Sequence, residues 1–166
     1  QVDDPFGNGL VESFSANFKT DGEVSVTKYA KDVSDLSGEA TKVSGEITRL
    51  SATGKTAFFC VCFLGEAQKL LQLAATDEAM GSVEWLGVEN LVNKDLLADA
   101  TQAAFLTKVK LTSVSFADRA NPNTQVFKDA FQAKFGSEPG PFTNYAYDAA
   151  NIAMLSMLAA GNSGAG

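Results

Sequence analysis

Histidine is absent from this chain of 166 residues, and its absence excludes several kinds of catalytic site. Histidine is the usual general base near neutral pH and a frequent metal ligand, so neither a Ser-His relay nor a histidine-ligated metal can be built here. Glycine motifs of the dinucleotide-binding, phosphate-loop and nucleophile-elbow types are missing as well. We therefore expect no enzyme, no catalytic residue, no cofactor and no metal site.

Runs of basic residues and long apolar segments are also lacking. The formal net charge is −7 and the isoelectric point is about 4.5, so the surface repels phosphate backbones and we expect no nucleic-acid partner. The longest apolar stretch, 152–160, is far shorter than the ~20 residues of a membrane span. An apolar content of 45 % is nevertheless enough for a real core.

Cysteine occurs only at Cys60 and Cys62, within the apolar run FFCVCFL. Residues i and i+2 of a strand point to the same face, roughly 6–7 Å apart, which is too far for an unstrained disulfide. Two thiols cannot complete a zinc site either. We therefore expect both cysteines to be small apolar residues in a buried strand.

Helical and extended patterns alternate along the chain. Asp4 and Pro5 form a typical helix start, because aspartate caps the first turn and proline suits the first helical position. Ser34 or Ser37 is expected to cap the second helix. The expected helices cover 6–19, from 34 or 37 to 54, 65–76, 93–100, 124–135 and 145–158. The expected strands cover 24–30, 56–63, 82–88 and 105–116.

This alternation predicts a doubly wound α/β fold, with a mostly parallel sheet flanked by helices. Such a fold normally has a strand before its first helix, and in the order 2-1-3-4-5 that strand lies in the middle of the sheet. Only Gln1 and Val2 stand at its place. We therefore expect the first strand to be missing from this sequence, and another chain or a segment outside it to fill the gap.

Ligands of open α/β sheets bind beyond the carboxyl ends of the strands, and three candidate residues follow such ends. Phe6 follows the place of the first strand, Phe63 ends the strand at 56–63, and Glu89 follows the strand at 82–88. Two aromatic rings and a carboxylate suit a small ligand that carries an ammonium group and an apolar part.

Each candidate also has a purely structural interpretation. Phe6 could fix the first helix to the core, and Phe63 could be an ordinary core residue. Glu89 could be a solvated loop acid or a helix cap. Hydrophobic periodicity alone does not decide between these interpretations and a binding role.

Four segments together resemble the type I periplasmic binding proteins, and among them the leucine/isoleucine/valine-binding branch. These segments are DDPFGNGLVESF, TAFFCVCFLGEAQKLLQLA, VEWLGVENL and ANPNTQVFKDAFQAKFGSEPGPFTNYAYDAANI. The resemblance extends from about residue 3 to about residue 155. It implies two α/β lobes that close over a ligand, with 1–116 as the second lobe, incomplete at its N-terminus, and 117–166 as a helical segment that returns to the first lobe.

The resemblance also implies roles for individual residues. Phe6 and Phe63 match cleft-wall positions at which the family often has tyrosine, so two hydroxyl groups are absent here. Glu89 matches the acid that faces the ammonium group of the ligand. Asn90 follows it, where glycine is common, and is included as a ligand-binding candidate.

The implied function is the extracytoplasmic solute-binding component of an ABC uptake system for an amino acid or a related small amide or amine. Its partners would be that small molecule and an ABC permease. Its location would be periplasmic or at the cell surface, with a possible lipid anchor. The alternative is a ligand-sensing ectodomain of a receptor or regulator with the same fold. We also expect self-association of this chain through its open sheet edge and its last two helices.

Overall fold

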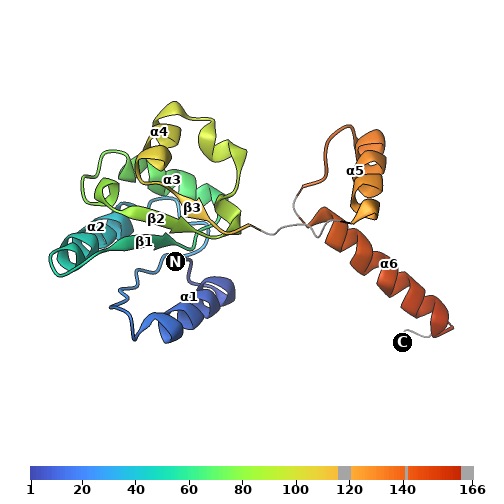
Figure 1. Ribbon diagram of the computed structural model, residues 1–166, viewed down its shortest axis with the longest axis horizontal. Coiled ribbons are helices and arrows are strands. Elements are labelled where there is room, and N and C mark those ends of the chain that lie inside the picture. The colour runs from blue at the N-terminus through green and yellow to red at the C-terminus, as the bar shows by residue number, and fades with distance from the viewer. Residues whose placement is uncertain (116–120, 141, 162–166) are drawn as a thin grey trace. The chain divides into compact units, whose positions relative to one another are not determined.

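The computed structural model describes residues 1–115, 121–140 and 142–161, and the chain divides into two compact units, Gln1–Ser115 and Phe116–Gly166. The first unit holds a parallel three-stranded sheet flanked by helices, so the expected α/β class is confirmed at this level (Figure 1). The expected boundary between 116 and 117 lies outside the described residues. The assignment of either part to a lobe stays a prediction.

The elements follow one another in the order α, α, β, α, β, α, β, α, α, with three short 3₁₀ helices between. The α-helices are α1 (Pro5–Phe18), α2 (Ser37–Ser51), α3 (Leu64–Ala74), α4 (Ala100–Lys108), α5 (Pro122–Phe135) and α6 (Thr143–Ala159). The strands are β1 (Ala57–Cys60), β2 (Glu84–Gly87) and β3 (Thr112–Ser113). The 3₁₀ helices are η1 (Met80–Ser82), η2 (Glu89–Leu91) and η3 (Lys94–Leu97).

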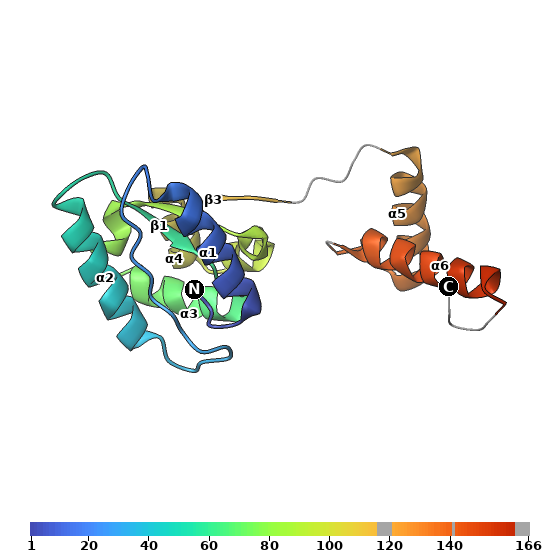
Figure 2. The ribbon, with the colours of Figure 1, turned by 90° about the horizontal axis from the view of Figure 1, so that it is seen from below.

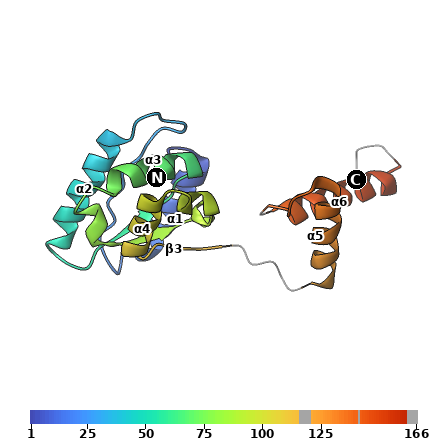
Figure 3. The same ribbon diagram turned by 90° about the horizontal axis from the view of Figure 1, so that it is seen from above.

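The sheet has the order β1-β2-β3, and both strand pairs are parallel. Helix α1 lies on one face, and α3 and α4 lie on the opposite face (Figures 1 and 3). Helix α2 packs against α3. Parallel strands need covered faces, and the crossover helices α3 and α4 provide the cover on one side.

Trp85 is the centre of the core of the first unit. Its side chain is 1 % exposed, and its indole N–H donates to the carbonyl of Met80 at 2.9 Å. The rings of Phe58 and Phe105 meet it edge-on, with centroids 4.6 and 5.2 Å away. These contacts join β1, β2 and α4, and edge-on aromatic pairs stabilise a core beyond their buried area.

Residues 1–3 lie between two extended segments. The N–H of Val2 donates to the carbonyl of Val61 at 3.1 Å, and Val2 forms a parallel bridge with Tyr29 on its other side. Val2 is fully buried. These residues therefore lie between the end of segment 24–30 and the chain that follows β1.

The expected strand at 24–30 is wrong as a regular strand. The segment is extended, but it pairs only through the bridge at Tyr29. A strand needs a neighbour along its length, and residues 1–3 reach only its final residues. Figure 2 shows this segment running between α1 and α2 past the N-terminus.

The expected strand at 105–116 is also wrong for its first half. Residues 105–108 complete α4, and only Thr112 and Ser113 form β3. The carboxylate of Asp99 caps α4 by accepting from the N–H of Gln102 at 2.9 Å. The apolar residues of this stretch alternate only in part, and helix formation buries Phe105 together with Leu106.

The first helix and its cap are confirmed, because the carboxylate of Asp4 accepts from the N–H of Gly7 at 2.8 Å and Pro5 opens the helix. The expected serine cap of the second helix is wrong. Leu36 holds the cap position of α2 and makes no capping hydrogen bond through its side chain. Ser37 is the first helical residue instead.

The expectation of two unlinked cysteines is wrong. Cys60 and Cys62 form a disulfide, and both are buried. The regular strand ends at Cys60, so the pair spans the strand end and its Cα atoms are 5.5 Å apart. The estimate of roughly 6–7 Å for two residues of a regular strand therefore does not apply.

The second unit contains α5 and α6. The ring of Phe127 in α5 meets that of Tyr147 in α6, with centroids 5.2 Å apart. Gly136 ends α5 in the left-handed region, at φ 74°, as is common at helix ends. No described residue of either helix is buried.

Candidate functional site

The carboxyl ends of the strands lie at one edge of the sheet, because all paired strands are parallel. Phe63 follows β1, Glu89 begins η2 directly after β2, and Phe6 stands in the first turn of α1. The hydrogen bond from Val2 to Val61 fixes the start of α1 beside the end of β1. The topology therefore places all three segments at this edge.

Phe6 and Phe63 form a stacked pair. Their ring centroids are 5.8 Å apart, and the angle between the ring planes is 26°. Phe6 keeps 37 % of its surface exposed, and Phe63 is half-buried against the core cluster. The pair therefore presents aromatic surface to solvent and can contact an apolar or cationic group.

Lys31 is a cation beside this ring pair that the sequence did not indicate. Its ammonium nitrogen lies 5.7 Å from the centroid of the Phe63 ring, within the range of a cation–π contact. A ligand with an ammonium group would compete with Lys31 for this ring face. A ligand carboxylate would instead be attracted by it.

Glu66 is a buried carboxylate one turn beyond Phe63. It is 4 % exposed, and it accepts from the N–H of Asp32 at 3.0 Å. The bond fixes the loop that carries Lys31, together with the bond from the Lys69 ammonium to the carbonyl of Val33 at 2.6 Å. Glu66 lies in the first turn of α3, where the helix dipole stabilises a negative charge.

Tyr29 lies directly before the same loop in the sequence and is buried. Burial of its hydroxyl, followed by the negative charge of Glu66, raises the pKa of Tyr29 to about 12. The hydroxyl therefore stays protonated at neutral pH. Neither Tyr29 nor Glu66 was indicated by the sequence, although a glutamate in the first turn of a helix is a known signal of a helix start.

Glu89 and Asn90 are half-buried in η2, and the carbonyl of Glu89 accepts from the N–H of Val92 at 3.0 Å. No hydrogen bond, ion pair or ring contact among the described residues joins Glu89 or Asn90 to the ring pair. The structure thus brings Phe6 and Phe63 together. It leaves Glu89 and Asn90 on the neighbouring loop of the same edge.

The described part of the chain holds no candidate metal site and no candidate membrane-spanning helix. Within the described ranges, no group of three acidic, cysteine or histidine residues could hold a metal ion. No helix of the described part is long and apolar enough to cross a membrane. A cavity of about 610 Å³ does exist, but none of the four candidate residues lines it.

Comparisons with known proteins give no further assignment. No family model, no curated protein and no solved structure matches this chain.

Proposed function

We propose that this chain is part of an extracytoplasmic solute-binding protein for an amino acid or a related small amide or amine. The observation that supports the proposal most is the stacked pair of Phe6 and Phe63 at the carboxyl edge of the parallel sheet. Ligands of open α/β folds bind at this edge. The resemblance in sequence supports the same location, because both rings match cleft-wall positions of that family.

The proposed mechanism uses three groups of the chain. The rings of Phe6 and Phe63 form an apolar wall, and the carboxylate of Glu89 pairs with the ammonium group of the ligand. The first lobe of such a protein would close over the ligand, and a permease would recognise the closed state. A disulfide such as Cys60–Cys62 persists in oxidising compartments, which supports a location outside the cytoplasm.

A calorimetric titration tests the role of Glu89. We expect an amino acid or small amine to bind the two-lobed protein that contains this chain, and Glu89→Gln to weaken binding by about tenfold or more, because a charge-assisted contact is lost. The matched control is Glu84→Gln, which changes an exposed carboxylate at the opposite end of β2. The control should keep full affinity.

Two results would contradict the proposal. Absence of binding by the two-lobed protein across a panel of amino acids, amides and amines would contradict the proposed function. Equal weakening by Glu89→Gln and Glu84→Gln would remove the role of Glu89, because a general change in charge would then explain the loss.

A further inference from the structure

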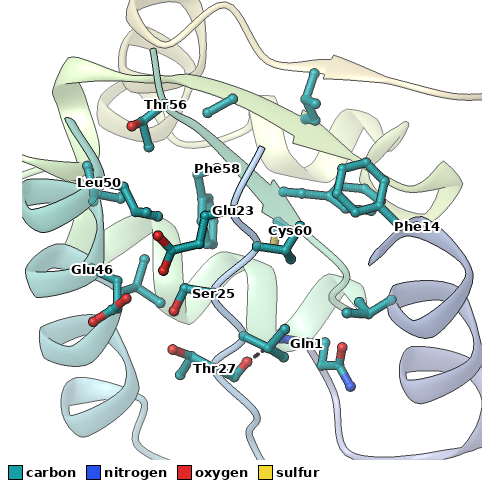
Figure 4. A pocket seen from close by; sticks show the side chains of 18 of the residues that line it. Gln1, Phe14, Glu23, Ser25, Thr27, Glu46, Leu50, Thr56, Phe58 and Cys60 are labelled. Carbon is teal, nitrogen blue, oxygen red and sulfur yellow. Dashed lines mark hydrogen bonds between the residues drawn. The ribbon is translucent and has the colours of Figure 1, made fainter. Parts of the chain in front are cut away.

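A groove separates the extended segment 24–29 from strand β1. It has a volume of about 610 Å³ and extends from Gln1 along β1 toward Lys55 and Thr56 (Figure 4). Helix α1 supplies Phe14 and Phe18 to its lining. The remaining apolar lining comes mainly from α2 and β1, namely Val43, Ile47, Leu50, Phe58 and Phe59.

The side of β1 that faces the groove carries backbone hydrogen-bonding groups. Val61 turns its carbonyl to Val2, and backbone groups of alternate strand residues point to the same side. Phe59 and Ala57 therefore direct their N–H and C=O groups into the groove. Across it, the carbonyl of Thr27 accepts from the Gln1 amine at 2.6 Å.

The residues that line the groove become more buried toward Gln1, both along β1 and along segment 24–29. Ala57 at the start of β1 is exposed, whereas Cys60 at its end and Val61 directly after it are buried. On the opposite wall Val26 is 46 % exposed, whereas Tyr29 is 7 % exposed. Residues 1–3 thus cover both segments where they lie between them, and both segments are exposed to solvent beyond Gln1.

The amine of Gln1 lies at the closed end of the groove, in the position of a peptide N–H. Its hydrogen bond to Thr27 continues the pattern in which the N–H of Asp3 donates to the carbonyl of Tyr29. Burial, with a smaller contribution from Lys28, lowers the pKa of this amine to about 6. A charged ammonium is therefore disfavoured there, whereas an uncharged amide would keep the bond.

We propose that the groove is a strand-binding site, and that its occupant is an apolar polypeptide strand joined to the amine of Gln1 and parallel to β1. Such a strand continues residues 1–3 between segment 24–29 and β1. The parallel sheet then has five strands. Their order is segment 24–30, the added strand together with residues 1–3, β1, β2 and β3. This inference does not depend on the proposed function.

The register of Val2 fixes the bonds of this strand. The residue directly before Gln1 donates its N–H to the carbonyl of Phe59. The residue before that accepts from the N–H of Thr27 and donates to the carbonyl of Ser25. About four residues fill the length of β1, since neighbouring parallel strands advance equally.

The walls also define the chemistry of the occupant. Alternate side chains of the strand face α1, where Phe14 meets Phe59 with centroids 5.3 Å apart. The others face Val43 and Ile47 of α2. Because both faces are apolar, the occupant is a continuous run of β-branched residues, as in strands covered on both sides.

Joining Val-Val-Ile-Val to Gln1 tests the proposal. We expect the midpoint of thermal unfolding, followed by the fluorescence of Trp85, to rise by at least about 5 °C over the chain extended by Ser-Gly-Ser-Gly. Both extensions convert the amine to an amide, so the difference reports the strand alone. Val-Val-Ile-Pro is the matched control, because proline removes the N–H that would bond to Phe59.

Amide hydrogen exchange gives a second measurement. We expect exchange at Phe59 and Thr27 to slow by at least about tenfold in the Val-Val-Ile-Val chain, because both N–H groups gain a partner. Phe58 and Cys60 face β2 instead, so their exchange should change less. The proline control should lose much of the protection.

Three results would overturn the proposal. The first is equal stabilisation by the Ser-Gly extension, and the second is loss of the folded Trp85 signal in the Val-Val-Ile-Val chain. The third is an equal rise in the unfolding midpoint when Val-Val-Ile-Val is added as a separate peptide, with a solubilising lysine at its N-terminal end. The groove would then bind a strand from a separate partner as well as one joined to Gln1.

Discussion

At the scale of single residues, Gln1 has the property that is simplest to test. The pKa of its amine is about 6 in the folded chain, against an ordinary value of 8.0, mainly because of burial. The unfolded chain therefore binds more protons between these two values. The free energy of unfolding should rise as the pH increases from about 6 to about 8 and lose this contribution as the pH falls.

Acetylation of the Gln1 amine should remove this dependence. The acetyl amide keeps an N–H for Thr27 and carries no charge, so the acetylated chain should be more stable below pH 6, by at most about 3 kcal/mol. Urea unfolding at pH 6 and pH 9 measures the difference, with a mass check that Gln1 has not cyclised. Parallel pH profiles of the two chains would contradict this assignment.

Gly7 and Gly9 form a matched pair within α1. A Cβ atom at Gly7 would collide with the backbone carbonyl of Val2 and lie 2.8 Å from its Cγ1, whereas a Cβ at Gly9 would meet nothing within 4 Å. Gly7→Ala should lower the free energy of unfolding by at least about 2 kcal/mol. Gly9→Ala should raise it by about 0.5–1 kcal/mol, because alanine favours a helix.

Chemical denaturation of both variants, followed by Trp85 fluorescence, measures this pair. Trp85 is the single tryptophan and lies in the same unit as α1, so it reports the relevant unfolding. Equal effects of the two substitutions would show that α1 does not pack closely on Val2.

At the scale of elements, the cap of α4 helps to explain why the first half of the expected strand at 105–116 is helical. Asp99→Ala should cost about 1 kcal/mol, because its carboxylate bonds to the N–H of Gln102. Asp95→Ala, which removes an exposed carboxylate from η3, is the control. If both changes cost the same in urea unfolding, the capping role would be wrong.

The sequence predicted those elements whose signals are local. Asp4 and Pro5 define the start of α1, and the apolar run at 56–63 contains β1. Residues 24–30 alternate like a strand, but they lack a neighbour along most of their length, which no local pattern reveals. The stretch 105–116 contains both the end of a helix and a two-residue strand, and its apolar pattern fits neither alone.

The candidate site was predictable only in part. Phe6 and Phe63 could be placed at one edge, because the α/β alternation fixes where strand ends lie, and they do stack. Lys31 could not, since it reaches Phe63 through an irregular loop. That loop depends on the buried carboxylate of Glu66, and burial of a single acid is a property of tertiary packing.

At the scale of the whole molecule, the second unit carries much exposed apolar surface. Exposed fractions in α6 reach 65 % at Ile152, 64 % at Leu155 and 67 % at Leu158. Large apolar patches on soluble proteins mark contact surfaces. Self-association through this unit therefore stays a prediction of the sequence analysis, now with named residues.

Light scattering over a concentration series tests this prediction. The average mass should rise with concentration, and Ile152→Lys with Leu155→Lys should shift the rise to concentrations at least about tenfold higher, because charge opposes apolar contact. A lysine substitution at exposed Thr101, in the first unit, is the control. A monomer at all concentrations would contradict the prediction.

The close approach of Gly7 to Val2 has a consequence for communication within the first unit. Gln1 lines the groove, Phe6 belongs to the ring pair, and the capped proline turn at the start of α1 lies between Val2 and Phe6. Because Gly7 lies directly against the Val2 backbone, we expect a shift of Val2 to displace the first turn of α1 and with it the ring of Phe6. A strand bound in the groove would then change the environment of Phe6 at the carboxyl edge of the sheet.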